Sequence, residues 1–182
     1  MDTVGMEEYA DLYTTMTIQT ETIDIAGLGE CEVKKGIEDG IVGAIYDIHE
    51  SLLEDRSYVD KEKGIAYFKE TYSFERMHYW RADFVVSIWR GDTCLGFGRA
   101  KYNGWVTHMF VSKQYQGYKL GKKILVLLEG ELIASGLKEI YLSAEPKTVA
   151  FYEHNGWKKR GEEVLVRQNV LLVPMYKTLA TV

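Results

Sequence analysis

The stretch Gln116-Gly117-Tyr118-Lys119-Leu120-Gly121-Lys122-Lys123 lies between an apolar segment that ends at Val111 and a helical pattern that begins at Ile124. A strand, a short glycine-containing loop and a helix N-terminus in this order bring several backbone N–H groups to one point. The helix dipole adds about half a positive charge at the same end. The stretch therefore predicts a binding site for a pyrophosphate group.

Strand and helix patterns alternate on both sides of this loop. Upstream, two β-rich segments flank a short glycine turn and predict an antiparallel hairpin, and a third strand follows them. Downstream, the pattern predicts a helix that ends near Ser135, a strand, a short helix and a closing hairpin. The predicted strands are 84–89, 94–100, 105–111, 139–143, 164–166 and 171–176, and the short helix is 148–154. Pro174 within the last strand predicts an edge strand or a bulge there.

The N-terminal part begins with an extension over residues 1–28, which holds at most one edge strand, and a short strand over 29–34. Apolar residues then recur at helical spacing at Ile41, Ile45, Ile48 and Leu52, and a second helix is predicted over 60–72. The complete order predicts a mixed α/β domain over 29–182 with a largely antiparallel sheet.

Composition limits the classes of function. The chain has 182 residues, 46% apolar residues and a net charge of −5, as expected for one globular domain. It has no long basic run, which argues against a nucleic-acid partner, and no apolar run long enough for a membrane. Cys31 and Cys94 have neither a CxxC spacing nor metal-ligand neighbours, so we expect free thiols, no metal site and a cytoplasmic location. A mildly acidic surface also favours a cationic substrate.

Three motifs occur in order along the chain. Val33-Lys34-Lys35-Gly36-Ile37-Glu38-Asp39 leads from the first strand into the first helix, and Met109-Phe110-Val111-Ser112 leads into the loop. Phe151-Tyr152-Glu153-His154-Asn155-Gly156-Trp157 follows later. The set resembles the GNAT superfamily of acyl-CoA-dependent N-acetyltransferases over about residues 29–179. In two departures from the family pattern, Lys119 replaces the usual second glycine of the loop and Glu145 replaces a common asparagine.

The resemblance implies a sheet of about six or seven strands with about four helices, splayed between its fourth and fifth strands around acetyl-CoA. By carry-over, the backbone of Met109, Phe110 and Val111 pairs with the pantetheine arm. The pyrophosphate is then held by the loop residues Gln116, Gly117, Tyr118, Lys119, Leu120, Gly121 and Lys122. Since a lysine tolerates a helical φ, we expect Lys119 to leave the loop intact. Two effects of its side chain are then open. The ammonium could add a positive charge near the phosphates, or the bulk of the side chain could narrow the pyrophosphate site and weaken cofactor binding.

The implied reaction is direct transfer of an acetyl group from acetyl-CoA to a primary amine within a ternary complex. Tyr152 is the candidate acid for the leaving thiolate, because a tyrosine stays neutral at pH 7. His108 and Glu145 are the candidate bases, although strand alternation turns His108 away from the face of Met109. A backbone N–H near Phe110 or Val111 would polarise the thioester. Residues on the first helix that could recognise a cationic amine are His49, Glu50, Glu54 and Asp55.

Several alternatives stay open at this point. The acceptor could be a small polyamine or amino compound, an amino sugar, or a protein N-terminus or lysine. A non-catalytic acyl-CoA-binding sensor or scaffold of the same fold is the main rival to an enzyme. A nucleotide-binding protein unrelated to CoA is less favoured, because no Lys-Ser/Thr pair follows the loop. A homodimer formed at the predicted edge strand around Pro174 is also compatible with the sequence.

Overall fold

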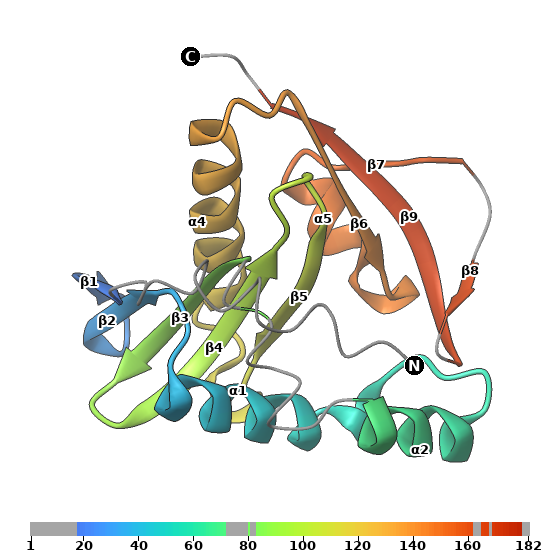
Figure 1. Cartoon of the computed structure of the whole chain (residues 1–182), viewed down its shortest axis with the longest axis horizontal. Coiled ribbons are helices and arrows are strands. Elements are labelled where there is room, and N and C mark those ends of the chain that lie inside the picture. The colour runs from blue at the N-terminus through green and yellow to red at the C-terminus, as the bar shows by residue number, and fades with distance from the viewer. Residues whose placement is uncertain (1–17, 72–79, 81–82, 162–164, 168, 180–182) are drawn as a thin grey trace, which may run out of the picture.

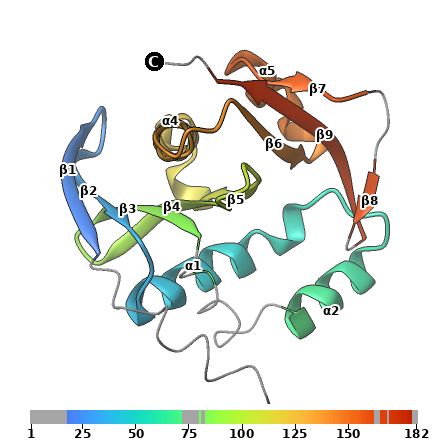
Figure 2. The same cartoon turned by 45° about the horizontal axis from the view of Figure 1, so that its top comes forward.

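Two antiparallel sheets and four α-helices make up the described part of the computed structural model, which comprises residues 18–71, 80, 83–161, 165–167 and 169–179. The larger sheet has the order β1-β2-β3-β4-β5 and the smaller one the order β6-β9-β7, with β8 also paired to β9. Figures 1 and 2 show α1 and α2 on one side of the larger sheet and α4 on the other. The strands of the larger sheet are β1 (Gln19–Ile25), β2 (Gly29–Lys35), β3 (Phe84–Arg90), β4 (Thr93–Ala100) and β5 (Val106–Val111). Those of the smaller are β6 (Glu139–Ala144), β7 (Lys158–Lys159), β8 (Leu165–Arg167) and β9 (Val170–Thr178).

The first helices form where the apolar spacing predicts them. The helix α1 (Asp39–Ser51) buries Ile41, Ile45 and Ile48 against Val85 and Phe97 of the sheet. The second helix, α2 (Lys61–Thr71), also lies within its predicted range. None of the helices in the described residues is both long enough and apolar enough to cross a membrane.

The helix α4 (Leu120–Ala134) packs closely on β4 because that strand carries two glycines on the facing side. A Cβ atom at Gly98 would lie 2.5 Å from Ile124 Cγ2 and 2.7 Å from Leu128 Cδ1. A Cβ atom at Gly96 would lie 2.8 Å from the carbonyl oxygen of Phe110. The glycines therefore set the distance between this helix, which starts at the predicted loop, and the sheet.

We predict that Gly98→Ala lowers the free energy of unfolding by about 1–3 kcal/mol, because the added methyl group overpacks the interface between helix and sheet. Gly130→Ala is the matched control, since no heavy atom lies within 4 Å of a Cβ at this position of α4. The control should raise the free energy of unfolding by about 0.5–1 kcal/mol, through the helix propensity of alanine. Urea denaturation of both variants measures the difference. A Gly98→Ala protein as stable as the wild type would contradict this close packing.

The two sheets touch at one corner and then diverge. The neighbouring strands β5 and β6 are joined by a single parallel bridge between Trp105 and Tyr141, where Tyr141 N donates to Gly104 O at 2.9 Å. Towards Val111 and Ala144 the two strands belong to separate sheets. The predicted splay between the fourth and fifth core strands is confirmed, and it opens a gap between β5 and β6.

Of the two alternatives predicted at Pro174, an edge strand or a bulge, the edge strand is wrong. In the structure, β9 is the middle strand, with β6 on one side and β7 and β8 on the other. Pro174 is tolerated because it lies opposite the interruption between β7, which ends at Lys159, and β8, which begins at Leu165. The edge argument for a homodimer therefore no longer applies at Pro174. The strand β7 has no counterpart in the predicted order.

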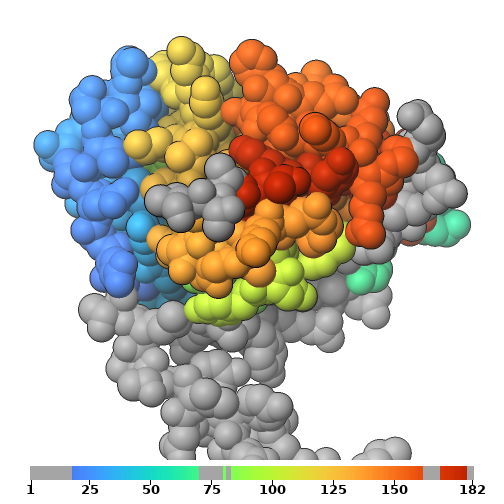
Figure 3. Space-filling view, turned by 90° about the horizontal axis from the view of Figure 1, so that it is seen from above, coloured from blue at the N-terminus to red at the C-terminus, as the bar shows by residue number. Residues whose placement is uncertain are grey.

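A further expectation concerns the N-terminal part of the chain. The possible edge strand within residues 1–28 is present as β1, which pairs with β2 along its full length, whereas residues 1–17 lie outside the described residues. Figure 3 shows β1 and β2, α4, β6 and the C-terminal strands side by side on one face of the molecule. On that face α4 lies between the N-terminal strands and the smaller sheet, so it contacts both halves of the fold.

Candidate active site

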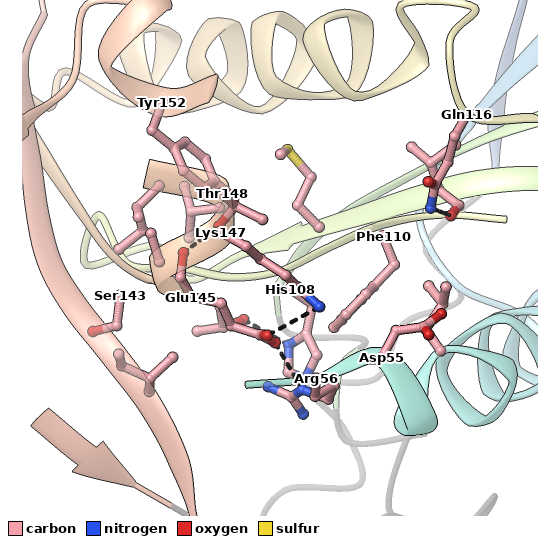
Figure 4. A pocket seen from close by; sticks show the side chains of 18 of the residues that line it. Asp55, Arg56, His108, Phe110, Gln116, Ser143, Glu145, Lys147, Thr148 and Tyr152 are labelled. Atoms are coloured by element: carbon pink, nitrogen blue, oxygen red, sulfur yellow. Dashed lines mark hydrogen bonds and ion pairs between the residues drawn. The ribbon is translucent and has the colours of Figure 1, made fainter. Parts of the chain in front are cut away.

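A cavity of about 580 Å³ occupies the gap between β5 and the end of β6 (Figure 4). Its walls come from β5, the segment after α1, the residues that follow β6 and the short helix α5 (Val149–His154). The predicted site residues in its lining are His108, Met109, Phe110, Val111, Gln116, Glu145 and Tyr152. The structure thus brings together the end of β5 with Gln116, the residue Glu145 after β6, and Tyr152 of the Phe-Tyr segment.

One wall of the cavity is an incompletely paired strand edge. On one side β5 is hydrogen-bonded to β4 from Val106 to Val111. On the other side, the bridge at Trp105 is the last pairing that the described residues provide. The polar groups of this edge can therefore receive an extended ligand that contains amides, in the manner of an added strand.

The predicted loop lies just beyond the cavity, at the start of α4. Gln116 lines the cavity and its side-chain amide donates to Val111 O at 3.3 Å, whereas residues 117–122 are outside the lining. Within the described residues, the backbone N–H groups of 117–122 have no protein acceptor, and the first bond into the helix runs from Lys123 N to Lys119 O at 3.1 Å. Leu120 is buried in the core, so only its backbone is available to a ligand.

Lys119 does not have the helical φ that we expected. Its backbone lies in the left-handed region, with φ 60° and ψ 16°, and Gly117 also has a positive φ of 94°. The turn into α4 requires this conformation, which glycine adopts without steric cost. A lysine in this region carries a conformational cost of about 1–2 kcal/mol.

We predict that Lys119→Gly raises the free energy of unfolding by about 1 kcal/mol, because glycine adopts the left-handed conformation without steric cost. Lys123→Gly, which replaces a lysine within the helix α4, should lower it by a similar amount. Chemical denaturation compares the two variants. CoA affinity, measured by calorimetry, should be unchanged or higher in Lys119→Gly if the side chain is mere bulk. A marked loss of affinity in Lys119→Gly would identify the ammonium as a phosphate ligand.

The start of α4 has a charge distribution that suits an anion. Lys119, Lys122 and Lys123 are exposed there, the first turn contains no acidic residue, and the described residues provide no ion pair for any of the three lysines. Helix N-termini usually favour acidic side chains, so three lysines at this end repel the dipole unless an anion lies between them. A Cβ at Gly121 would lie 3.6 Å from Phe151 Cζ and 4.0 Å from Val111 Cγ2, so the loop, the end of β5 and the Phe-Tyr segment meet at this turn.

Tyr152 extends from α5 into the cavity (Figure 4). Its residue exposure is 8%, and its ring contacts Phe151 and Trp157 edge-on, with ring centroids 5.1 Å and 6.0 Å away. Trp157 is itself held by a bond of 3.0 Å from its Nε1 to Glu129 Oε1. Burial, with a smaller contribution from the charge of Glu145, raises the pKa of Tyr152 above its usual value. The hydroxyl is therefore protonated at neutral pH, and the ring that carries it is packed between aromatic neighbours.

Glu145 ties the loop after α1 to the smaller sheet. Its two oxygens accept from Arg56 Nε at 2.9 Å and from Ser57 N at 2.8 Å, and Lys147 Nζ lies 3.6 Å away. Burial acts to raise the pKa of this carboxyl, but the bonds from Ser57 and Arg56 outweigh it, and the pKa lies below its usual value. As a base Glu145 would therefore be weak, since its carboxylate is stabilised by two donors.

His108 faces α1, as strand alternation predicts, and lines the cavity from that side. Its ring lies 4.6 Å from that of Trp80 and 5.7 Å from that of His49, measured between centroids. Burial, followed by the charges of His49 and Arg99, lowers the pKa of His108 well below 6.5. Burial and Arg56 lower the pKa of His49 to about 3. Both imidazoles are neutral at pH 7, and neither is a strong base.

The residues predicted to recognise a cationic amine do not form a free anionic site, although Asp55 lines the cavity. Glu54 forms an ion pair with Lys61, and Asp55 forms one with Lys113 at 2.7 Å. Glu50 is exposed. His49 is buried. These pairs leave no unpaired carboxylate from this group at the cavity.

Sequence reasoning missed Arg56 and Lys113, which line the cavity, and Ser57, which binds Glu145. Asp55 binds Lys113, just after β5, while Arg56 and Ser57 bind Glu145, just after β6. The segment 55–57 therefore spans both arms of the gap. Arg56 lies 89 positions from its partner Glu145, in a stretch without periodicity, so the local pattern contains no signal for this contact.

Comparisons with known proteins agree with this geometry. The structure is similar to a GCN5-related N-acetyltransferase from Rhodopseudomonas palustris, with a TM-score of 0.66, 15% identity and coverage of 81% of this chain and 94% of that one. It is also similar to a ribosomal-protein-alanine N-acetyltransferase from Brucella melitensis, with a TM-score of 0.65, 15% identity and coverage of 81% and 99%. A third similar structure is the paia N-acetyltransferase from Thermoplasma acidophilum in complex with coenzyme A, with a TM-score of 0.57, 18% identity and coverage of 90% and 100%.

Sequence comparisons add a family assignment. No curated protein sequence matches the chain. A family profile described as the acetyltransferase (GNAT) domain matches residues 54–179, which is more than half of the chain. This match includes β5, the loop, α4 and the Phe-Tyr segment. The chain therefore belongs to the GNAT acetyltransferase family.

Proposed function

We propose that the protein transfers an acetyl group from acetyl-CoA to a primary amine by direct attack in a ternary complex. The observation that carries this proposal is the gap between β5 and β6, which ends at a turn with unpaired backbone N–H groups and three lysines. The pantetheine arm would pair with the β5 edge at Met109 to Val111, and the pyrophosphate would bind the turn at 117–122. The coenzyme A complex of the Thermoplasma relative supports the choice of cofactor.

Tyr152 would act on the leaving group. Its hydroxyl donates a hydrogen bond to the sulfur atom as the C–S bond breaks and negative charge develops there. Because the pKa of Tyr152 is raised, the hydroxyl keeps its proton until the thiolate forms. A backbone N–H of β5 near Phe110 or Val111 would stabilise the oxyanion of the tetrahedral intermediate.

The amine would enter as the free base. His108 and Glu145, the candidate bases, have lowered pKa values, so neither takes a proton readily at pH 7. Direct attack by a neutral amine then leaves a proton to be lost to water after the C–N bond has formed. The ratio kcat/KM should therefore rise with a slope of one on a logarithmic plot until the pH reaches the pKa of the acceptor amine.

The proposal is tested by incubating the protein with acetyl-CoA and each member of a panel of amines, and measuring the CoA thiol that is released. The panel includes amino acids, amino sugars, polyamines and peptides. Calorimetry should detect binding of CoA and acetyl-CoA, and CoA rather than ATP should raise the melting temperature. Tight CoA binding with no turnover on any amine would favour a sensor or scaffold. Stabilisation by ATP alone would instead contradict the assignment of the cofactor.

A further inference from the structure

A second cavity, of about 380 Å³, adjoins the first on the side of β5 that faces α1. The two cavities share Arg56, His108 and Phe110 in their linings, so they meet beside the centre of β5. Its volume suits a small molecule. An amine held in the second cavity can therefore reach a thioester that lies along β5 from the other side.

The wall of the second cavity carries positive charge without carboxylates. Arg56, Arg99 and Lys101 line it, and the described residues contribute no aspartate or glutamate to the lining. The two imidazoles in the wall, His49 and His108, are neutral at pH 7 because burial lowers the pKa of each. The charged side chains in the lining are therefore all cationic.

The three cations differ in how much of their charge is already matched. Arg99 donates from Nε to Asp83 Oδ2 at 2.7 Å and stacks on Trp80, with its Cζ 4.4 Å from the ring centroid. Arg56 uses Nε on Glu145 and has no other acceptor among the described residues. Lys101 is exposed and has no acidic partner in the described part of the chain. Arg56 and Lys101 therefore keep donors for an anionic ligand.

We propose that the acceptor is a small primary amine that also carries an anionic group, and that Lys101 and Arg56 bind that group in the second cavity. The anionic group is a carboxylate or a phosphate, since both accept hydrogen bonds from these cations. The same positive field disfavours an ammonium ion and lowers the pKa of a nearby amino group, which favours the neutral nucleophile. This inference rests on the proposed function and reverses the expectation of a cationic substrate.

Matched pairs of amines test the inference. The pairs are glycine with glycinamide, L-glutamate with L-glutamine, and 2-aminoethyl phosphate with ethanolamine, with rates referred to the free-base concentration of each. We expect kcat/KM to be at least tenfold higher for the member with the additional anionic group. In Lys101→Ala this ratio should fall about tenfold, and in Lys101→Glu it should invert. Lys158→Ala, an exposed lysine of β7 outside both linings, is the control and should keep the wild-type ratio.

Binding to the protein–CoA complex, measured by calorimetry, separates this inference from the proposed function. If the pairs bind differently and Lys101→Ala removes the difference while no acetyl group is transferred, the anion site stands and the transferase proposal fails. If transfer occurs but spermidine, or a peptide with an amidated C-terminus, is a better acceptor than the anionic amines, and Lys101→Ala does not change this preference, the inference is wrong. The carboxylate and phosphate pairs show which anion the site prefers.

Discussion

Replacing Tyr152 by phenylalanine is expected to lower kcat by about 10²- to 10⁴-fold, the range typical of a lost general acid or hydrogen-bond donor. The ring contacts with Phe151 and Trp157 remain in this variant, so the fold and the cavity wall should be preserved. The affinity for CoA should therefore change by less than about threefold, since stacking rather than the hydroxyl shapes the wall. Steady-state thiol release and calorimetry measure the two effects separately.

The matched control is Tyr102→Phe, which makes the same chemical change at a residue that is 48% exposed and outside both cavity linings. Its kcat should equal that of the wild type. If Tyr152→Phe kept kcat within threefold of the wild type, the proposed role of the hydroxyl would be wrong. Loss of CoA affinity equal to the loss of kcat would point to a packing role instead.

Lowering the pH from 6.5 to 5 is expected to reduce the free energy of unfolding by about 1.6 kcal/mol through His49 alone, with His108 acting in the same direction. The pKa of His49 is about 3 in the folded protein against 6.5 for an unperturbed histidine, so the unfolded chain binds more protons between these values. Stability therefore rises with pH across this window and is independent of these two residues above it. Urea denaturation at pH 5, 6 and 7 gives the slope.

His49→Phe should remove the contribution of His49 to the slope, because a phenylalanine ring can occupy the space between Phe68 and Phe110 without titrating. The comparison uses the change in stability with pH, so any constant effect of the new ring on stability cancels. His154→Gln, which replaces an exposed histidine, is the comparison variant. Equal slopes in the wild type and His49→Phe would show that His49 does not resist protonation in the folded state.

Local patterns in the sequence predicted those helices and strands whose determining residues lie within a short segment of the chain. The spacing of Ile41, Ile45 and Ile48 predicted α1, and the glycine turn predicted the β3–β4 hairpin. The motif from Gln116 to Lys123 predicted a helix after the loop, with a helical pattern from Ile124, and α4 begins four residues earlier, at Leu120. Resemblance to a family then predicted the splay that follows β5, which no local pattern contains.

Features that depend on distant contacts could not be predicted in this way. The conformation of Lys119 follows from how the turn must pass from β5 to a helix packed on Gly98. The engagement of Glu145 depends on Arg56, and the neutral state of His108 depends on burial under α1. The usual positions of proline in sheets suggested an edge strand or a bulge at Pro174. In the structure the neighbouring strand is interrupted between β7 and β8, and this interruption accommodates a residue without an N–H group.

The central position of β9 determines the order in which the two sheets can fold during synthesis. All five strands of the larger sheet precede residue 112. In the smaller sheet, β6 and β7 both pair with β9, so that sheet cannot form until the chain has been synthesised to the end of β9 at Thr178. A nascent chain folds its N-terminal parts first. The β5 edge and the turn into α4 can therefore form on the ribosome before the wall that carries Tyr152 is fixed. The half of the site that would hold a cofactor is ready before the half that would act on it.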